Sequence, residues 1–224
     1  MTNGEQLLRG QSGRILIVVS FGWLTIQCGR LVLSPFVPEI TSELGVSSFK
    51  IGLSFTTLWG VYALLQYPSG RLSDVLSRKT VLLVGLSCTI LGFIALGTAQ
   101  TYPLFLASTA IVGLGAGFYP TAARALVAEY FVNKRSKAFG IHTGSGDAGG
   151  VAAAGLSTAA LSFATWRSAF IPILIMLGAV LIFYYRWSNE AIVLKWSDLE
   201  AHSIVRRLLS NPIMRGFLFS YVLY

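Results

Sequence analysis

The stretch from Gly70 to Lys79 reads GRLSDVLSRK, and it separates two long segments that carry no charged side chain, residues 51–70 and 80–100. A helix of about 20 apolar residues is long enough to cross the roughly 30 Å hydrocarbon core of a membrane. The stretch itself places one acid among three bases. We therefore interpret Gly70–Lys79 as a short polar loop between two membrane-spanning helices.

The composition of the whole chain favours the same class. Hydrophobic residues make up 54% of the 224 residues, whereas charged residues make up 12%, and the mean hydropathy is +0.68. A soluble domain with so few charges would lack the polar surface needed to cover its core. The cysteines Cys28 and Cys88 both lie in apolar runs, where they are typical of small buried side chains. We expect no cofactor and no bound metal.

The charge-free runs predict an all-α integral membrane protein with six spanning helices. Their expected ranges are 15–38, 49–70, 79–99, 103–124, 138–162 and 168–187. These helices form a first unit, 1–187. The polar and amphipathic stretch 188–211 predicts a cytoplasmic central loop. Residues 212–224 begin a seventh apolar segment that stops before a crossing is complete, so we expect a truncated chain.

The distribution of Lys and Arg predicts the orientation, because cytoplasmic loops carry an excess of both. One side of the membrane would hold nearly all of them, whereas the other would hold Lys50 and Arg167. The N-terminus is therefore expected in the cytoplasm of a multi-pass protein of the cell membrane. The net charge of +8 is explained by anionic lipid at that face, so a nucleic-acid partner is not expected.

The opening loop resembles the signature of the major facilitator superfamily, in which a Gly is followed by an Asp and then by a small residue and two bases. The matching residues are Gly70, Asp74, Ser77, Arg78 and Lys79. Two positions differ from the usual pattern. Val75 stands where a base is usual, and Ser77 where Gly is usual. The second difference predicts a less strained turn.

Further segments resemble family positions in the same order. They are PFVPEI at 35–40, GLGAGFYPTAARALVAEYF at 113–131, NKRSKAFG at 133–140 and TWRSAF at 165–170. The resemblance implies the N-terminal half of such a transporter, a six-helix bundle built of 3+3 inverted repeats. It also implies a C-terminal half as partner, and alternating access by rocking of the two halves.

The resemblance further implies a cytoplasmic gate in the signature loop. Its expected members are Gly70, Asp74, Arg78 and Lys79, with Glu129 and Arg135 as a second part at the end of the fourth helix. Charged side chains in such a cluster can hold two bundles together through hydrogen bonds. The alternative is that these are ordinary interfacial charges that only mark the topology.

Ionisable side chains inside the spans indicate a substrate site, because each is costly in lipid. Arg30 lies well inside the first helix, one turn after Gln27. The spacing between Arg30 and Pro38 is similar to that in organophosphate antiporters and organic-anion symporters of the family. A guanidinium can bind a carboxylate or phosphate through two hydrogen bonds. Asp147 on the fifth helix is the second candidate. It could bind substrate, exchange a proton, or form a buried ion pair with Arg30.

Three functions remain open at this level. The first is a secondary transporter of a small solute, with an organic anion favoured and with a proton, sodium or a counter-substrate as the coupling partner. The second is a proton-coupled exporter of drugs or neutral solutes, although no proline lies between Pro120 and Pro172 to form the Gly-Pro motif of drug exporters. The third, remote alternative is an intramembrane serine protease using Ser87 and His142, which are expected at opposite depths.

Glycines cluster on the fourth and fifth helices. They are Gly113, Gly115, Gly117, Gly140, Gly144, Gly146, Gly149 and Gly150. The pattern predicts surfaces where helices pack closely. It does not match a phosphate-binding loop, because no strand precedes it and no Lys follows at the required spacing.

Overall fold

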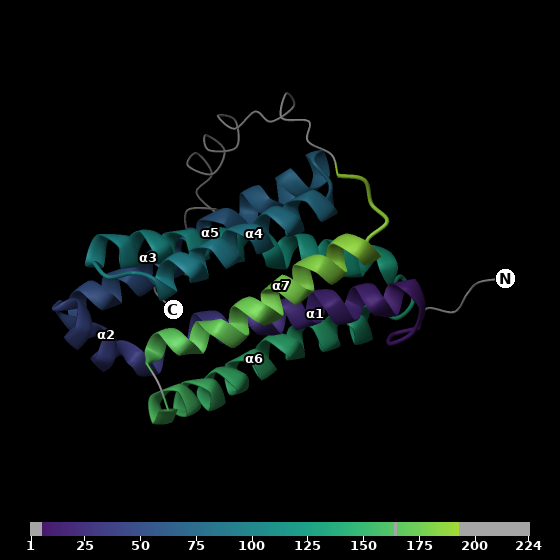
Figure 1. Ribbon diagram of the computed structural model, residues 1–224. Coiled ribbons are helices and arrows are strands. Elements are labelled where there is room, and N and C mark those ends of the chain that lie inside the picture. The colour runs from purple at the N-terminus through teal and green to yellow at the C-terminus, as the bar shows by residue number, and fades with distance from the viewer. Residues whose placement is uncertain (1–5, 164, 193–224) are drawn as a thin grey trace.

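A computed structural model describes residues 6–163 and 165–192, and these residues form helices joined by short connections (Figure 1). The elements are α1 (Gly10–Leu31), η1 (Ser34–Phe36), α2 (Val37–Leu44), α3 (Ser48–Val75), α4 (Arg78–Gly97), α5 (Tyr102–Tyr130), α6 (Arg135–Phe163), η2 (Trp166–Ala169) and α7 (Phe170–Trp187). The expected all-α class is confirmed. The predicted seventh segment and most of the central loop lie outside the described residues.

The first predicted helix, 15–38, is wrong over its last seven residues. α1 ends at Leu31 and is followed by the short η1 and then by α2. Pro35 and Pro38 are the second residues of these two elements. Proline has no backbone N–H to donate to the preceding turn, so a continuous helix is interrupted there.

The second predicted boundary also differs. α3 continues past Gly70 to Val75, so the ten-residue loop shrinks to Leu76 and Ser77 between α3 and α4. Gly70 and Asp74 therefore lie on the last turns of a helix. The polar side chains of this segment project from a helix end, and helical hydrogen bonding continues through them.

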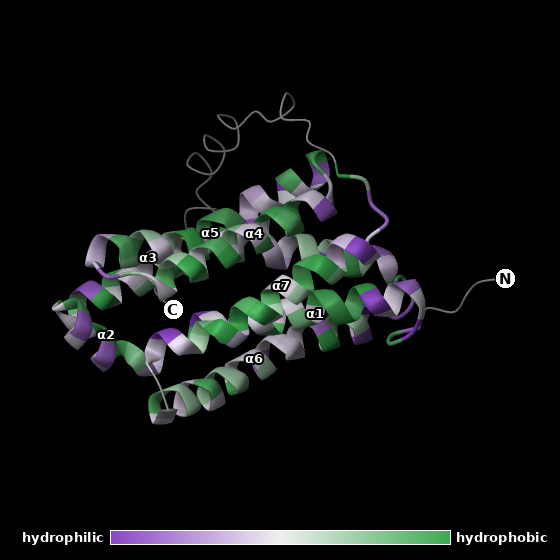
Figure 2. Ribbon diagram, viewed as in Figure 1, coloured by the Kyte–Doolittle hydropathy of each residue, from purple (hydrophilic) through white to green (hydrophobic). Residues whose placement is uncertain are grey.

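Within residues 6–163 and 165–192, four segments are long and apolar enough to cross a membrane: 10–44, 78–97, 102–130 and 166–187. α3 and α6 have 28 and 29 residues, or about 42 Å at 1.5 Å per residue, so their length is also sufficient. Their side chains are less apolar, and α6 consists mostly of Ala, Gly, Ser and Thr. Figure 2 shows hydrophilic residues gathered toward the two ends of the bundle.

The helices pack in two groups that fit an inverted repeat. α1 packs most extensively on α6 and α7, whereas α5 packs on α3 and α4, and Figure 1 shows the two groups as separate layers. Counting α1–α2 as the first span, the spans of the first repeat are α1–α2, α3 and α4, and those of the second are α5, α6 and α7. The first helix of each repeat thus packs on the second and third helices of the other.

Close packing by glycine is found at several of the predicted positions. A Cβ on Gly117 would lie 2.8 Å from the Tyr62 carbonyl oxygen, and one on Gly113 would overlap the carbonyl of Leu58. Gly115, Gly146 and Gly149 are similarly enclosed. The prediction is wrong for Gly140 and Gly144, where an added Cβ would meet no atom within 4 Å and which lie on the exposed face of α6.

The turn between α3 and α4 is strained, contrary to the prediction from Ser77. This residue has φ 143° and ψ 153°, a region that is essentially restricted to glycine and costs about 1–3 kcal/mol for other residues. Its side chain compensates in part: Oγ accepts a hydrogen bond from the Thr80 backbone N–H at 3.2 Å and donates one to the Ala191 carbonyl at 3.1 Å.

Ser77→Gly is therefore expected to stabilise the protein. Relief of the backbone strain outweighs the loss of the side-chain cap, which costs only a few tenths of a kcal/mol on replacement by Gly. A net gain of about 1 kcal/mol corresponds to a rise of about 2–4 °C in the midpoint of thermal unfolding in detergent. Ser145→Gly, at a helical position of α6, is the matched control and should lower the midpoint. A lower midpoint for Ser77→Gly would contradict the strain.

Candidate functional site

Arg30 is the centre of the candidate substrate site. It lies in the last turn of α1 and is 4% exposed. Its Nη1 donates a hydrogen bond of 2.9 Å to Gln27 Oε1, so the two predicted residues come together as expected from their spacing of three. The guanidinium carbon also lies 3.8 Å from the centre of the Trp59 ring and 3.9 Å from that of Tyr62.

The two aromatic residues on α3 were not among the sequence candidates. Their rings are nearly perpendicular, with an interplanar angle of 83° and centroids 5.8 Å apart, and we call them the aromatic corner. A cation over an aromatic face is stabilised by about 0.5–2 kcal/mol. The sequence feature that could have indicated them is the spacing of three between Trp59 and Tyr62 in the second predicted helix, 49–70. This spacing places both rings on one face of a helix.

Asp147 lies on the part of α6 that packs along α1 but makes no ion pair with Arg30. Gly149, two residues later on α6, packs against the backbone of Leu24 and the side chain of Gln27. Asp147 itself is exposed. Within the described ranges the ion pairs are Arg78 with Glu129 and Arg167 with Glu43, so the predicted Arg30–Asp147 pair is not found there.

His142 is enclosed in an aromatic stack. Its ring lies 6.3 Å from that of Trp23, and Trp23 also stacks on Tyr119 at 6.4 Å. His142 is 1% exposed, and neither ring nitrogen has a hydrogen-bond partner among the described residues. Tyr119 donates to the Val19 carbonyl at 2.9 Å. These rings join α1, α5 and α6 in the core of the bundle.

The gate candidates contact different partners and do not form one cluster of charges. Arg78 forms an ion pair of 2.8 Å with Glu129, which connects the start of α4 to the end of α5. Arg135 donates instead to the Ala128 carbonyl at 3.1 Å. Asp74 is exposed and is in no ion pair with another described residue. Arg78 and Glu129 are partly exposed, so their ion pair stabilises the fold by at most about 1 kcal/mol.

Lys79 is buried and holds the segment that follows α7. Its Nζ donates to the Ser188 carbonyl at 2.6 Å, and its backbone N–H donates to the Glu190 carboxylate at 2.9 Å. A carboxylate at the N-terminus of α4 is favoured by the helix dipole. Ser188 and Glu190 were not predicted from the sequence.

The opposite end of the bundle is held by acids of α2. Glu43 accepts hydrogen bonds from the Trp166 indole N–H at 2.6 Å and from Arg167, and Glu39 accepts one from the Trp166 backbone N–H at 3.3 Å. Arg167 also donates to the Ala99 carbonyl. These contacts attach α2 to the start of α7 and to the end of α4.

A comparison with protein families decides the class. The sequence model of the Major Facilitator Superfamily matches residues 19–224. The chain belongs to the major facilitator superfamily. Members of this superfamily are multi-pass membrane transporters and not enzymes, so the serine protease alternative is excluded.

Curated relatives within the superfamily carry different substrate names. A probable hexose phosphate transport protein of Chlamydia muridarum is 30% identical over 75% of this chain and 38% of its own length. A probable sulfoacetate transporter of Cupriavidus necator is 29% identical over 74% of this chain and 38% of its own. A probable vesicular acetylcholine transporter of Danio rerio is 29% identical over 57% of this chain and 28% of its own. The chain thus spans less than two fifths of the length of each of these relatives.

Proposed function

We propose that this chain forms one half of a secondary active transporter that moves a small organic anion by alternating access. The observation that carries the proposal is Arg30, a permanently charged side chain that is 4% exposed within an apolar bundle. A buried charge in such a bundle is costly and is typical of a substrate or ion site. The hexose phosphate and sulfoacetate names belong to relatives aligned over about three quarters of this chain.

In this proposal Arg30 binds the anionic group of the substrate with two charge-assisted hydrogen bonds. Gln27 fixes the guanidinium through the hydrogen bond to Nη1. Asp147 is a further substrate-binding residue, because α6 passes α1 at the level of Gln27. A C-terminal half would complete the cavity, as in transporters built from two halves related by symmetry.

The gate is proposed for the end of the bundle that carries the signature loop. Its residues are Gly70, Asp74, Arg78, Lys79, Glu129 and Arg135. The Arg78–Glu129 pair supports a connection of α4 to α5 within this half. The exposure of Asp74 at the end of α3 supports a role in contact with another half. No nucleotide-binding motif occurs in the sequence, so we propose a proton, a sodium ion or a counter-substrate as the source of energy.

The proposed function is tested by uptake into vesicles that contain the natural protein. The panel pairs anions with uncharged or cationic solutes of similar size: glucose 6-phosphate with glucose, sulfoacetate with ethanolamine. We expect saturable uptake of one or more anions and none of the matched solutes. Uptake of the uncharged or cationic members alone would contradict an organic-anion transporter.

The second candidate is a proton-coupled exporter of drugs or neutral solutes. The acetylcholine relative and the exposed carboxylate of Asp147 favour it, because an acid can bind an amine or exchange a proton. The aromatic corner is then a surface for an apolar or cationic substrate. The uptake panel separates the two candidates, since they predict opposite members of each pair.

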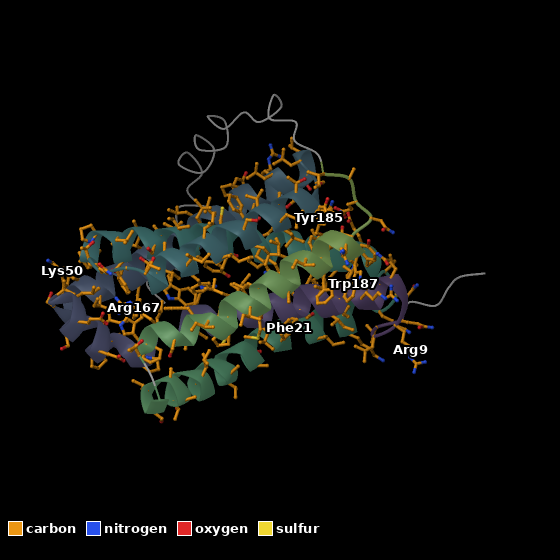
Figure 3. The ribbon with its side chains drawn as sticks, viewed as in Figure 1. Arg9, Phe21, Lys50, Arg167, Tyr185 and Trp187 are labelled. Carbon is orange, nitrogen blue, oxygen red and sulfur yellow. The ribbon has the colours of Figure 1, made fainter. Side chains whose placement is uncertain are left out.

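The N-terminus is proposed to be cytoplasmic in the cell membrane, with a six-helix unit at 1–187, a central loop at 188–211 and a seventh helix beginning at 212. Figure 3 supports the charge asymmetry: Lys50 and Arg167 lie toward one end of the bundle, and Arg9 lies at the other. Positive charge is expected to stay on the cytoplasmic side.

Cysteine labelling is expected to confirm this orientation. Ser136 is the second residue of α6, Ser47 directly precedes α3, and both are exposed. The two helices begin at opposite ends of the bundle (Figure 1). In a background with Cys28→Ala and Cys88→Ala, a cysteine at 136 should react with an impermeant maleimide only after the membrane is opened. A cysteine at 47 should react in intact cells. Labelling of both from one side would contradict the six-span topology.

A further inference from the structure

The aromatic corner is held more firmly than a pair of surface aromatics would be. Gly113 and Gly117 of α5 receive the backbone carbonyls of Leu58 and Tyr62 at positions where a Cβ would collide. α3 is therefore seated on α5 at the turn that carries Trp59 and Tyr62. The backbone under both rings is fixed by this close approach.

The corner also reaches across helices. Trp59 and Tyr62 belong to α3, whereas Arg30 belongs to α1, and α1 packs chiefly on α6 and α7. Trp59 is 40% exposed although one side of its ring faces the guanidinium, and Tyr62 is 5% exposed. Trp59 therefore contacts Arg30 on one side and forms part of the surface of this half on the other.

The chemistry of the corner differs from that of an acid in the same place. A carboxylate beside Arg30 would stabilise the guanidinium and cancel its charge. Aromatic faces stabilise the cation through their quadrupole and leave its net charge at +1. Two rings at nearly 90° also contact the guanidinium from two directions, which limits its rotation. An oriented fork loses less entropy when it binds an oxyanion.

We propose that Trp59 and Tyr62 are positioning residues that hold the Arg30 guanidinium charged and oriented for a carboxylate, sulfonate or phosphate group. This inference rests on the proposed function and adds to it the residues that determine the anion preference. The substrate class is a small organic oxyanion whose charged group meets Arg30 and whose organic part lies against the exposed part of Trp59.

The experiment measures binding of glucose 6-phosphate, sulfoacetate and inorganic phosphate to the purified natural protein by calorimetry. Trp59→Leu and Tyr62→Leu should each raise the dissociation constant about 5- to 30-fold, since each removes one cation–π contact. Trp59→Phe and Tyr62→Phe keep a ring and should stay within about threefold. Phe49→Leu, an exposed aromatic at the start of the same helix, is the matched control and should leave binding unchanged.

A second measurement does not depend on tolerance of the leucine variants. Tryptophan with one to four fluorine atoms at position 59 keeps nearly the same shape while the negative potential of its ring face falls with each fluorine. The dissociation constant for the anion should rise stepwise along this series. A merely structural role for Trp59 would leave it constant, and a constant value would overturn the inference.

The outcomes separate the inference from the function on which it rests. If Arg30→Gln abolishes binding while the leucine and fluorinated variants bind normally, the positioning role is wrong and the anion site stands. If Arg30→Gln binds all three probes as tightly as the unmodified protein does, or if the unmodified protein binds none of them, the proposed function is overturned together with this inference. Weaker binding in Arg30→Gln and also in the leucine and fluorinated variants, with normal affinity in Phe49→Leu, supports both the anion site and the positioning role.

Discussion

Replacing Arg30 by Gln is expected to lower uptake of the anionic substrate by at least about thirtyfold. Truncating one partner of a buried, hydrogen-bonded charge pair costs about 2–5 kcal/mol, and about 2 kcal/mol corresponds to a factor of about 30. Gln retains hydrogen-bonding capacity and much of the size, so the loss reports the charge. The measurement is initial uptake rate in vesicles, normalised to the amount of inserted protein.

Two further variants separate charge from geometry. Arg30→Lys keeps the charge but loses the planar fork, so uptake should fall by about tenfold. Asp147→Asn should be milder, because Asp147 is exposed and is not paired with Arg30. If Asp147 were instead the functional partner of Arg30, either single change would damage expression and the charge-swapped double variant would recover part of it. Full uptake of an uncharged solute by Arg30→Gln would contradict an anion transporter.

Gly113→Val is expected to have the largest effect on stability. The added side chain would enter the Leu58 carbonyl of α3, which is backbone and cannot move aside as a side chain can. Overpacking of a closely packed site costs about 1–3 kcal/mol and more where backbone must shift, so we expect more than about 3 kcal/mol and a collapse of folded yield. Size-exclusion chromatography in detergent and the thermal midpoint measure both.

Gly140→Val supplies the matched control. It also lies in a long helix, α6, and no atom of a neighbouring helix lies within 4 Å of its Cβ position, so the intrinsic cost of Val in a helix is present without the collision. Its folded yield should remain close to that of the unmodified protein. A similar loss in both variants would show that β-branching, and not close packing on α3, is responsible.

The sequence was most informative where hydrophobic residues run without charge. The two apolar segments around Gly70–Lys79 predicted two helices, and α3 and α4 start within one residue of the expected positions. Arg30 and Gln27 could be paired because a spacing of three on a helix brings side chains together. Of the side chains around Arg30, the sequence predicted Gln27, which lies on the same helix, and did not predict Trp59 and Tyr62, which lie on another.

Contacts between distant segments could not be predicted in the same way. Lys79 and Ser188 are separated by 109 residues, and nothing in the composition of the short stretch after α7 marks it as a partner. The aromatic corner depends on how α3 rotates against α1, which the close approach of α3 to Gly113 and Gly117 determines. The break after Leu31 and the extension of α3 to Val75 depend on local hydrogen bonding, which hydropathy does not report.

The exchanged packing of the two repeats has a consequence for biosynthesis. α3, α4 and α5 follow one another in the chain and pack on each other, so they can assemble as the ribosome delivers them. α1 finds its main neighbours only when α6 and α7 have been made, about 130 to 160 residues later, or about 7–30 s at 5–20 residues per second. During that interval the helix that carries Arg30 is in the membrane or its insertion machinery without the α6 and α7 surfaces that later cover it.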